Sequence, residues 1–299
     1  MKFGKLDDIS GIDFSLPADH PENLSVLRTG NGRQLEVFSG GTMWGIPKWK
    51  GKIFPEKTPV KDFASHYCQQ FGCIELNATH YRIHPPATIE KWKALAPQDF
   101  RFCPKWPQLI THYRRFNNSD GLTDEFLEAV MHFGENLGPC FLQLPPNYTQ
   151  KYAARLREYL KTLPRDIKIA VEYRHPDWFT GSEEVEKTWT LMQELGIGAV
   201  VSDTSGRRDA VHMRLTAPWM VMRYGGNNLD STDRDRLEDW ALRIKSWAEN
   251  GLEAFYLLVH QENSILTPET CVMFNELLSE HCGIETKTPQ FYSNQGALL

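Results

Sequence analysis

The sequence predicts a single α/β domain of the TIM-barrel type, a (β/α)8 barrel, and three observations favour it. The chain has 299 residues, and one barrel of this type takes about 250 residues. Eight short apolar runs recur along the chain, and amphipathic segments of helical period separate most of them. Strands that are apolar on both faces and alternate with such helices are typical of a parallel sheet covered on both sides. An open, doubly wound sheet is the alternative, because periodicity alone does not prove closure.

Each predicted strand is a run rich in apolar residues, bounded by polar or glycine-containing loops. In chain order, we expect strands at residues 36–41, 73–77, 100–105, 140–144, 168–173, 198–202, 219–223 and 254–259. The link that follows the sixth strand, residues 204–218, leaves little room for a covering helix. We therefore expect a long, partly irregular loop there.

The ends of several helices are also readable. Thr123 is predicted to cap a helix that ends before Gly138 and buries Phe126, Leu127, Val130 and Met131. Ser182 and Ser231 precede two further helices, which end before Gly196 and Gly251. Thr267 followed by Pro268 reads as a cap with proline at the first helical position.

The domain organisation follows from these elements. We expect the barrel domain at residues 34–282, an N-terminal extension at residues 1–33, and a short polar C-terminal tail at residues 283–299. The extension is expected to pack on the outside or the bottom of the barrel.

Composition excludes several classes of protein. The chain carries 33 Lys and Arg against 38 Asp and Glu, a formal net charge of -5, which disfavours non-specific coating of duplex DNA. The apolar runs are far shorter than the roughly 20 residues that a membrane helix needs, and the charged start is unlike a signal peptide. We therefore expect a cytoplasmic protein. Six scattered cysteines without a C-x-x-C pair indicate neither a disulfide scaffold nor a zinc finger.

Polar side chains follow every predicted strand, where α/β barrels bind their ligands. The predicted catalytic residues are Glu75, Lys105, Glu172 and Asp203. The predicted substrate-binding residues are Thr42, Trp44, Asn77, Thr79, Tyr81, Gln143, Arg174, His175, Trp178, Arg223 and His260. The aromatic members are expected to stack on a planar or sugar-like group.

Strand parity sharpens this prediction, because side chains alternate between the two faces of a strand. Glu75 shares a face with Asn77, and Glu172 shares a face with Arg174. If those faces point inward, carboxylates and cations converge on one pocket. Buried charges are costly unless paired, and pairing tunes them for proton transfer. The structural alternative is that Glu75, Lys105, Glu172 and Arg223 form a charge network that only fixes the fold.

No cofactor or metal is predicted. The chain has no P-loop, no G-x-G-x-x-G turn and no H-E-x-x-H motif. His80 and His84 have ligand-like spacing, but Pro85 follows at once. A mixed site of His112, His175 and His260 with Glu172 and Asp203 is the weaker alternative.

Several motifs in order resemble the YecE-like family of bacterial and archaeal proteins, over about residues 38–280. They are Gly41-Thr42-Met43-Trp44, Ile74-Glu75-Leu76-Asn77-Ala78-Thr79-His80-Tyr81-Arg82, Phe102-Cys103-Pro104-Lys105, Gln143-Leu144-Pro145-Pro146, Val171-Glu172-Tyr173-Arg174-His175-Pro176-Asp177-Trp178 and Ser202-Asp203-Thr204. The resemblance implies a TIM barrel with marked strand-end residues, but no reaction, since the family is known as a domain of unknown function. The family more usually has Ser-Gly-Trp near Met43-Trp44 and Thr-Phe-Tyr at Thr79-His80-Tyr81, so substrate contacts are expected to differ.

The functional prediction is an enzyme of hydrolase or isomerase type that acts on a small anionic or sugar-like metabolite. Glu75 or Glu172 would transfer the proton, and Lys105 or Arg223 would stabilise developing negative charge. Two alternatives stay open: a nucleic-acid-binding or endonuclease-like repair protein, and a metabolite-binding protein without turnover.

Overall fold

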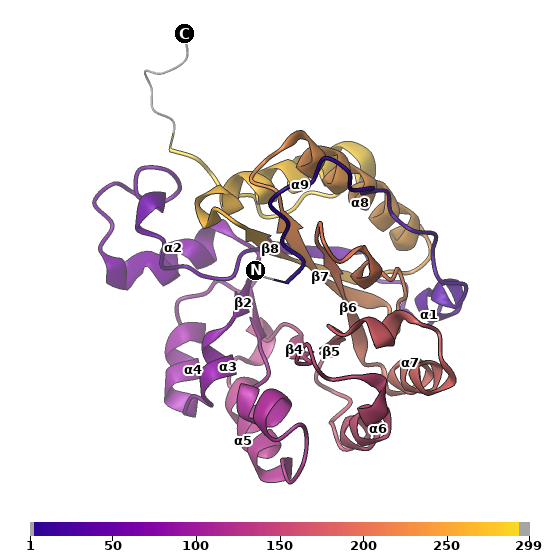
Figure 1. Ribbon diagram of the computed structural model, residues 1–299. Coiled ribbons are helices and arrows are strands. Elements are labelled where there is room, and N and C mark those ends of the chain that lie inside the picture. The colour runs from indigo at the N-terminus through magenta and orange to yellow at the C-terminus, as the bar shows by residue number, and fades with distance from the viewer. Residues whose placement is uncertain (1–2, 293–299) are drawn as a thin grey trace.

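The computed structural model describes residues 3–292 and has parallel strands at its centre with helices around them (Figure 1). All eight predicted strands are present. They are β1 (Glu36–Gly40), β2 (Cys73–Leu76), β3 (Arg101–Pro104), β4 (Cys140–Gln143), β5 (Ile169–Glu172), β6 (Gly198–Asp203), β7 (Trp219–Gly226) and β8 (Ala254–Gln261). Their ends differ little from the prediction; β7 and β8 extend further than expected toward their carboxyl ends.

The strands hydrogen-bond in parallel, in two groups. Six form a sheet in the order β1-β8-β7-β6-β5-β4, and β2 pairs with β3. Between β1 and β2, the amide of Gly72 donates to Ser39 O at 3.0 Å. Between β3 and β4, the amide of Gly138 donates to Phe102 O at 2.7 Å. The fold is thus α/β and TIM-barrel-like, as predicted, although no continuous ladder of strand pairs runs all the way round.

Gly40 explains how β1 approaches β2 without a regular ladder. A Cβ atom at Gly40 would lie 1.8 Å from the carbonyl oxygen of Cys73. Only glycine allows two backbones to come this close. The hydroxyl of Tyr67 bridges the same junction, because it accepts from the Gly41 amide at 2.6 Å and donates to Cys73 O at 2.9 Å.

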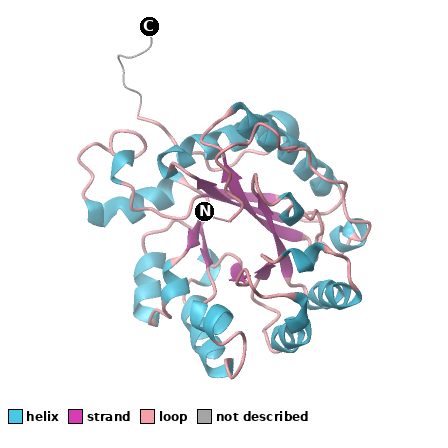
Figure 2. Ribbon diagram, viewed as in Figure 1, coloured by secondary structure: helices cyan, strands magenta, loops and turns pink. Residues whose placement is uncertain are grey.

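Helices surround the strands (Figure 2). In chain order they are α1 (Asn23–Leu27), α2 (Phe63–Gln70), α3 (Ala78–Tyr81), α4 (Pro86–Lys93), α5 (Asp120–Met131), α6 (Ala153–Lys161), α7 (Glu183–Leu195), α8 (Ser231–Glu249) and α9 (Thr267–Cys282). Residues 204–218 hold a single short 3-10 turn, Arg208–Ala210, so the prediction of an irregular link is confirmed.

The predicted helix ends are right for some helices and wrong for others. Ser182 does precede α7, and Gly196 ends it at φ +65°. Thr123, in contrast, lies inside α5, where its hydroxyl donates to Ser119 O at 2.9 Å, and Met131 is 55% exposed rather than buried. Asp230 caps α8 in place of Ser231, because its carboxylate accepts from the Thr232 amide at 3.1 Å.

Two apolar regions flank the strands. One lies between the strands and the helices and contains most of the buried aromatic side chains. The other fills the space enclosed by the strands and consists of Phe38, Cys73, Cys103, Phe141, Ala170, Val200, Ala217, Trp219, Val221, Ala254, Tyr256 and Leu258. Stacked inward-facing side chains of this kind are the packing that a barrel interior requires.

The first and last described segments of the chain pack against the barrel. In the C-terminal tail, Tyr292 donates its amide to Lys52 O at 2.8 Å. The N-terminal segment agrees only in part with the prediction that it packs outside or at the bottom. Asp19 does lie on the outside, where it pairs with Arg243 of α8, but residues 3–9 cross the mouth where the carboxyl ends of the strands lie (Figure 1). Residues 1–2 and 293–299, which belong to the predicted extension and tail, lie outside the described residues. Within residues 3–292, no helix is long and apolar enough to cross a membrane.

Candidate active site

Inward-facing positions continue from the apolar interior into a charged layer at the carboxyl ends of the strands. Two residues beyond the interior positions Cys73, Cys103, Phe141, Ala170, Val200, Val221 and Leu258 stand Glu75, Lys105, Gln143, Glu172, Ser202, Arg223 and His260. A step of two residues keeps the same face of a strand. Seven strands or strand ends therefore aim a polar group at the same space.

Arg223 joins the two carboxylates of this layer. Its Nε and Nη2 donate to the two oxygens of Glu75 at 3.0 and 2.9 Å, and its Nη1 donates to Glu172 Oε1 at 2.7 Å. All three side chains are at most 3% exposed. We call Glu75, Glu172 and Arg223 the cavity network. The predicted convergence of β2, β5 and β7 on one pocket is therefore present.

Further side chains brace the cavity network. Arg174 Nη2 donates to Glu172 Oε1 at 3.0 Å, and Ser202 Oγ donates to the same oxygen at 2.8 Å. His260 Nε2 lies 2.7 Å from Glu75 Oε2. Glu172 Oε2, by contrast, is buried and has no hydrogen-bond partner among the described residues.

The pKa values follow from this pairing. Burial opposes ionisation of Glu172, but Arg174 and then Arg223 lower its pKa to about 2. Burial is likewise outweighed at Glu75, whose pKa Arg223 holds well below the ordinary value. Burial lowers the pKa of His260 to about 4, so its imidazole is neutral at pH 7. Both carboxylates are thus ionised near neutrality and are weak proton acceptors.

Lys105 differs from the other charged groups of the layer. Its side chain is 8% exposed, yet its Nζ makes no ion pair or hydrogen bond within residues 3–292. Burial, and then the charge of Arg223, lower its pKa to about 8. Lys105 therefore presents an amine whose hydrogen-bonding capacity is not used by the described part of the chain.

These groups line a cavity of about 640 Å³ at the mouth of the barrel. Its charged walls are Glu75, Lys105, Arg174 and Arg223, and Glu262 at the rim is paired with Lys5 at 2.7 Å. The neutral predicted residues that line it are Thr42, Asn77, Tyr81, Gln143 and His260. With Glu172 counted, two carboxylates face three cations, so one positive charge is in surplus.

Asp203 is not part of this site. It follows Ser202 in β6 and therefore points to the opposite face, toward α8. There it accepts from Arg236 Nη2 at 2.8 Å and from Trp240 Nε1 at 2.7 Å, and it also pairs with Arg208. Asp203, Asp233 and Arg236 are fully buried together; we call them the helix-side network.

Four other predicted site residues have contacts that fix the fold and do not line the cavity. Thr79 is buried and its hydroxyl bonds to Leu76 O and Lys105 O, both at 2.8 Å. Trp178 is buried and donates to Tyr148 O at 2.7 Å. His175 accepts from the Asp177 amide at 3.2 Å, and Trp44 packs edge-on against Trp92.

The histidines do not gather into a metal centre. His80 bonds through Nδ1 to Trp106 O at 2.7 Å, and burial lowers the pKa of both His80 and His112 to about 4. Within residues 3–292, no group of three or more His, Cys, Asp or Glu side chains is placed to hold a metal ion.

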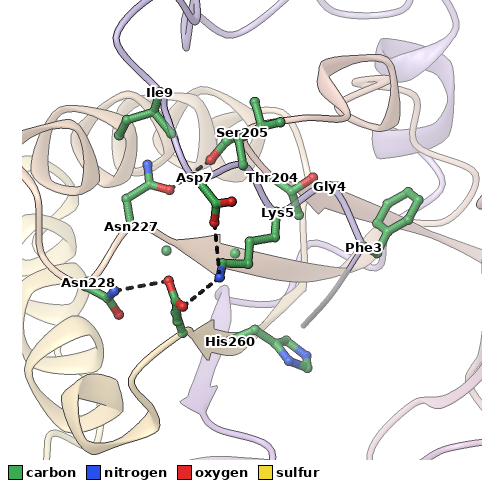
Figure 3. A pocket seen from close by; sticks show the side chains of 14 residues that line it. Phe3, Gly4, Lys5, Asp7, Ile9, Thr204, Ser205, Asn227, Asn228 and His260 are labelled. Atoms are coloured by element: carbon green, nitrogen blue, oxygen red, sulfur yellow. Dashed lines mark hydrogen bonds and ion pairs between the residues drawn. The ribbon is translucent and has the colours of Figure 1, made fainter.

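The N-terminal segment is the main part of the site that the sequence did not reveal. Phe3 lies against the guanidinium of Arg174, with 4.2 Å between Cζ and the ring centroid, and the Gly206 amide donates to Gly4 O at 2.7 Å. Lys5 pairs with Glu262 (Figure 3). Between this segment and the barrel lies a second cavity of about 430 Å³, which shares His260 and Glu262 with the first. Residues 3–9, the strap, therefore cover part of the mouth.

Comparison with known proteins finds relatives over most of the chain. A family described as protein of unknown function DUF72 matches residues 38–292. The UPF0759 protein YecE of Escherichia coli K12 is 27% identical over 78% of this chain and 89% of its own length. The UPF0759 protein YunF of Bacillus subtilis 168 is 27% identical over 74% of this chain and 87% of its own.

Solved structures with a similar fold carry the same family name. A DUF72 family protein from Enterococcus faecalis V583 superposes with a TM-score of 0.62 at 16% identity, covering 82% of this chain and 96% of that one. Another, from Thermotoga maritima MSB8, gives a TM-score of 0.57 at 20% identity, covering 81% of this chain and 99% of the other. The strap precedes residue 38 and so lies outside the region that the family description matches.

Proposed function

The chain belongs to the DUF72 family, and from the geometry of its cavity we propose that it is an enzyme that binds a small anionic metabolite there and transfers a proton on it. The observation that carries this proposal is the surplus positive charge. Three cations and the carboxylates Glu75 and Glu172 gather at one cavity, while Glu262 at its rim pairs with Lys5. Lys105 has no anionic partner within hydrogen-bonding distance in the described chain. Buried charges are costly unless compensated, so an anion that enters the cavity gains an unusually favourable partner.

The cavity residues divide into two roles. Arg223 is held by Glu75 and Glu172 on several sides, so this trio forms a rigid, charged floor. Asn77, Gln143 and Thr42 supply amide and hydroxyl groups for the hydroxyls of a sugar-like ligand. Tyr81, which is 71% exposed, stands at the rim.

Proton transfer falls to Lys105 rather than to a carboxylate. Arginine neighbours keep the pKa of Glu172 near 2, whereas Lys105, with a pKa of about 8, is close to the solution pH at which a cytoplasmic enzyme works. General acid–base catalysis is most efficient when the pKa of the group lies near the operating pH. Of the hydrolase and isomerase classes, we propose isomerase chemistry, since a single amine can take a proton from one carbon and return it to another.

The direct test is anion binding by calorimetry. We expect inorganic phosphate and three-carbon sugar acids to bind the full chain, and Lys105→Met to weaken binding by roughly tenfold or more, as loss of a charged hydrogen bond does. Lys187→Met is the matched control, because Lys187 carries the same charge but pairs with Glu183 on the surface of α7. Equal anion affinity of the wild type, Lys105→Met and Lys187→Met would contradict the proposal.

A further inference from the structure

We propose that Lys105 Nζ acts as a nucleophile that forms an imine with the carbonyl carbon of a 2-oxo acid. This inference rests on the proposed function, because it takes the cavity to be an anion site and names the class of anion. It also changes the role of Lys105 from proton carrier alone to covalent partner.

The backbone around Lys105 is fixed, so its side chain starts from a defined point on the inner face of the barrel. The Lys105 amide donates to Leu76 O at 3.3 Å, and its carbonyl accepts from the hydroxyl of Thr79 at 2.8 Å. Its Nζ lies 5.7 Å from the centroid of the Phe141 ring. These contacts come from β2, α3 and β4, and they place the side chain among inward-facing groups of three neighbouring strands.

The two carboxylates of the cavity network pair with arginines and not with this amine. Glu75 binds two nitrogens of Arg223, and Glu172 binds Arg223, Arg174 and Ser202. Neither carboxylate lies within an ion-pair distance of Lys105 Nζ in the described chain. An amine in this position keeps its lone pair available once it is neutral, whereas a salt-bridged lysine would stay protonated.

Burial and nearby cations make the neutral form accessible. Burial first, and Arg223 and Arg174 in addition, lower the pKa of Lys105 to about 8. Desolvation and a neighbouring cation are the two devices by which proteins activate lysine as a nucleophile toward carbonyl groups.

A 2-oxo acid fits both features of the cavity. Its carboxylate neutralises the one positive charge in surplus, and its carbonyl lies on the adjacent carbon, within reach of an amine in the same cavity. A neutral ketone has the carbonyl group that the amine would attack but no negative charge for the surplus cation. A phosphate ester without a carbonyl has the negative charge but no carbon for the amine to attack.

The step balances without a further reactant. The neutral amine adds to the carbonyl carbon and its proton passes to the carbonyl oxygen, which gives a carbinolamine. Loss of that oxygen as water, with the second N–H proton, forms the C=N bond. No oxidant or reductant takes part, and the resulting imine draws electrons from the neighbouring carbon, which makes its proton easier to remove.

Reductive trapping tests the proposal on the full chain. Pyruvate, the smallest stable 2-oxo acid of this type, is added with sodium cyanoborohydride, and intact mass followed by peptide mapping locates the adduct. We expect one adduct per chain on Lys105 and none on that residue in Lys105→Arg, which keeps the charge but removes the nucleophile. Lys168→Arg is the control, because Lys168 also has a lowered pKa but its ammonium lies over Trp219 and Tyr256 and outside the cavity.

The rate of trapping separates Lys105 from surface lysines. At pH 7.5, a lysine with a pKa of about 8 has on the order of 200-fold more neutral amine than one at the ordinary value of 10.5. We expect the rate at Lys105 to rise with pH and level off above about 8. Methyl pyruvate, which lacks the charge, should label Lys105 more slowly than pyruvate despite its more reactive carbonyl.

The outcomes distinguish this inference from the proposed function. If pyruvate binds by calorimetry but trapping labels surface lysines as readily as Lys105, the imine is wrong and the anion site stands. If neither phosphate nor pyruvate binds, the proposed function fails first. Selective labelling of Lys105 that is lost in Lys105→Arg and kept in Lys168→Arg supports the imine.

Discussion

The cavity network and the helix-side network are built from the same kinds of side chain but differ in how completely their carboxylate oxygens are hydrogen-bonded. In the helix-side network, Asp203 accepts from Arg236 and Trp240, and both oxygens of Asp233 accept hydrogen bonds from Tyr224, Gln261 and the amides of Asn227 and Leu229. In the cavity network, Glu172 Oε2 has no partner among the described residues, and Lys105, which lines the same cavity, makes no ion pair within residues 3–292.

This difference separates a structural ion network from a candidate site. In the helix-side network, Arg236 Nε has no hydrogen-bond partner among the described residues, but every carboxylate oxygen has one. A buried network of this kind has no acceptor left to offer a ligand. A network with an unsatisfied oxygen and a surplus cation is costly for an isolated fold, and a ligand can relieve that cost. The sequence presents both sets as charged residues at strand ends and does not distinguish them.

Removal of Asp203 should have the largest effect on stability. Asp203→Ala leaves Arg236, which is 1% exposed, without its main partner, and breaking a buried pair costs about 3–5 kcal/mol. Urea denaturation measures this loss. The control is Asp209→Ala, which removes a partly exposed pair with Arg207 and should cost about 0–1 kcal/mol. Equal midpoints for the two variants would show that the helix-side network does not stabilise the fold.

Acid should weaken the fold through the cavity network. The pKa of Glu172 is about 2 in the folded chain against an ordinary value of 4.5, so its contribution is present above pH 4.5 and is lost as the pH falls toward 2. The shift corresponds to about 3 kcal/mol. Unfolding free energies of the wild type and Glu172→Gln, measured from pH 5 to pH 2, should therefore converge. A constant difference in unfolding free energy between the two proteins over this pH range would contradict the pairing of Glu172 with Arg174 and Arg223.

Alkali should have the opposite effect through Lys105. The pKa of Lys105 is about 8 when folded against 10.5 ordinarily, so between these values the unfolded chain binds more protons and stability rises with pH. The gain of the wild type relative to Lys105→Met should reach about 2–3 kcal/mol over this range. Lys187→Met, on the surface, serves as the reference variant. A flat difference between pH 8 and 10.5 would mean that the Lys105 amine is paired.

The strap should affect only the cavity network, and by the smallest amount. Phe3→Ala removes the ring that lies against Arg174 and Arg207. We expect the rate at which trinitrobenzenesulfonate modifies Lys105 to rise a few-fold, with the urea midpoint nearly unchanged. Modification of Lys187 provides an internal standard. No change in the Lys105 rate relative to Lys187 would exclude a covering role for the strap.

Much of the fold was predictable because it depends on local patterns. The apolar runs located every strand, and Ser182 with Gly196 bounded α7. Parity correctly grouped Glu75 with Asn77 at the cavity. Thr123 misled the prediction because a threonine inside the first turn of a helix looks the same in sequence as one that caps it.

Asp203 and the strap show where local patterns stop being informative. β6 is apolar on both faces, so the sequence does not indicate whether Ser202 or Asp203 points inward. The answer depends on α8, which brings Arg236 and Trp240 to the outer face some thirty residues later in the chain. The strap is similarly positioned by a distant residue, because Lys5 pairs with Glu262, which lies 257 residues later in the chain.

The sequence by itself therefore determined the strands, the four helices α5, α7, α8 and α9, and the set of polar residues at the strand ends, since these follow from periodicity and from contacts a few residues apart. Only the tertiary structure decided which carboxylates each arginine neutralises. It therefore also decided that Lys105 has no carboxylate partner within residues 3–292. Charge pairing depends on distances between strands that are far apart in sequence. Neighbouring residues of a strand point to opposite faces, so a shift of one residue moves a side chain from the ligand cavity to a structural ion pair on the helix side.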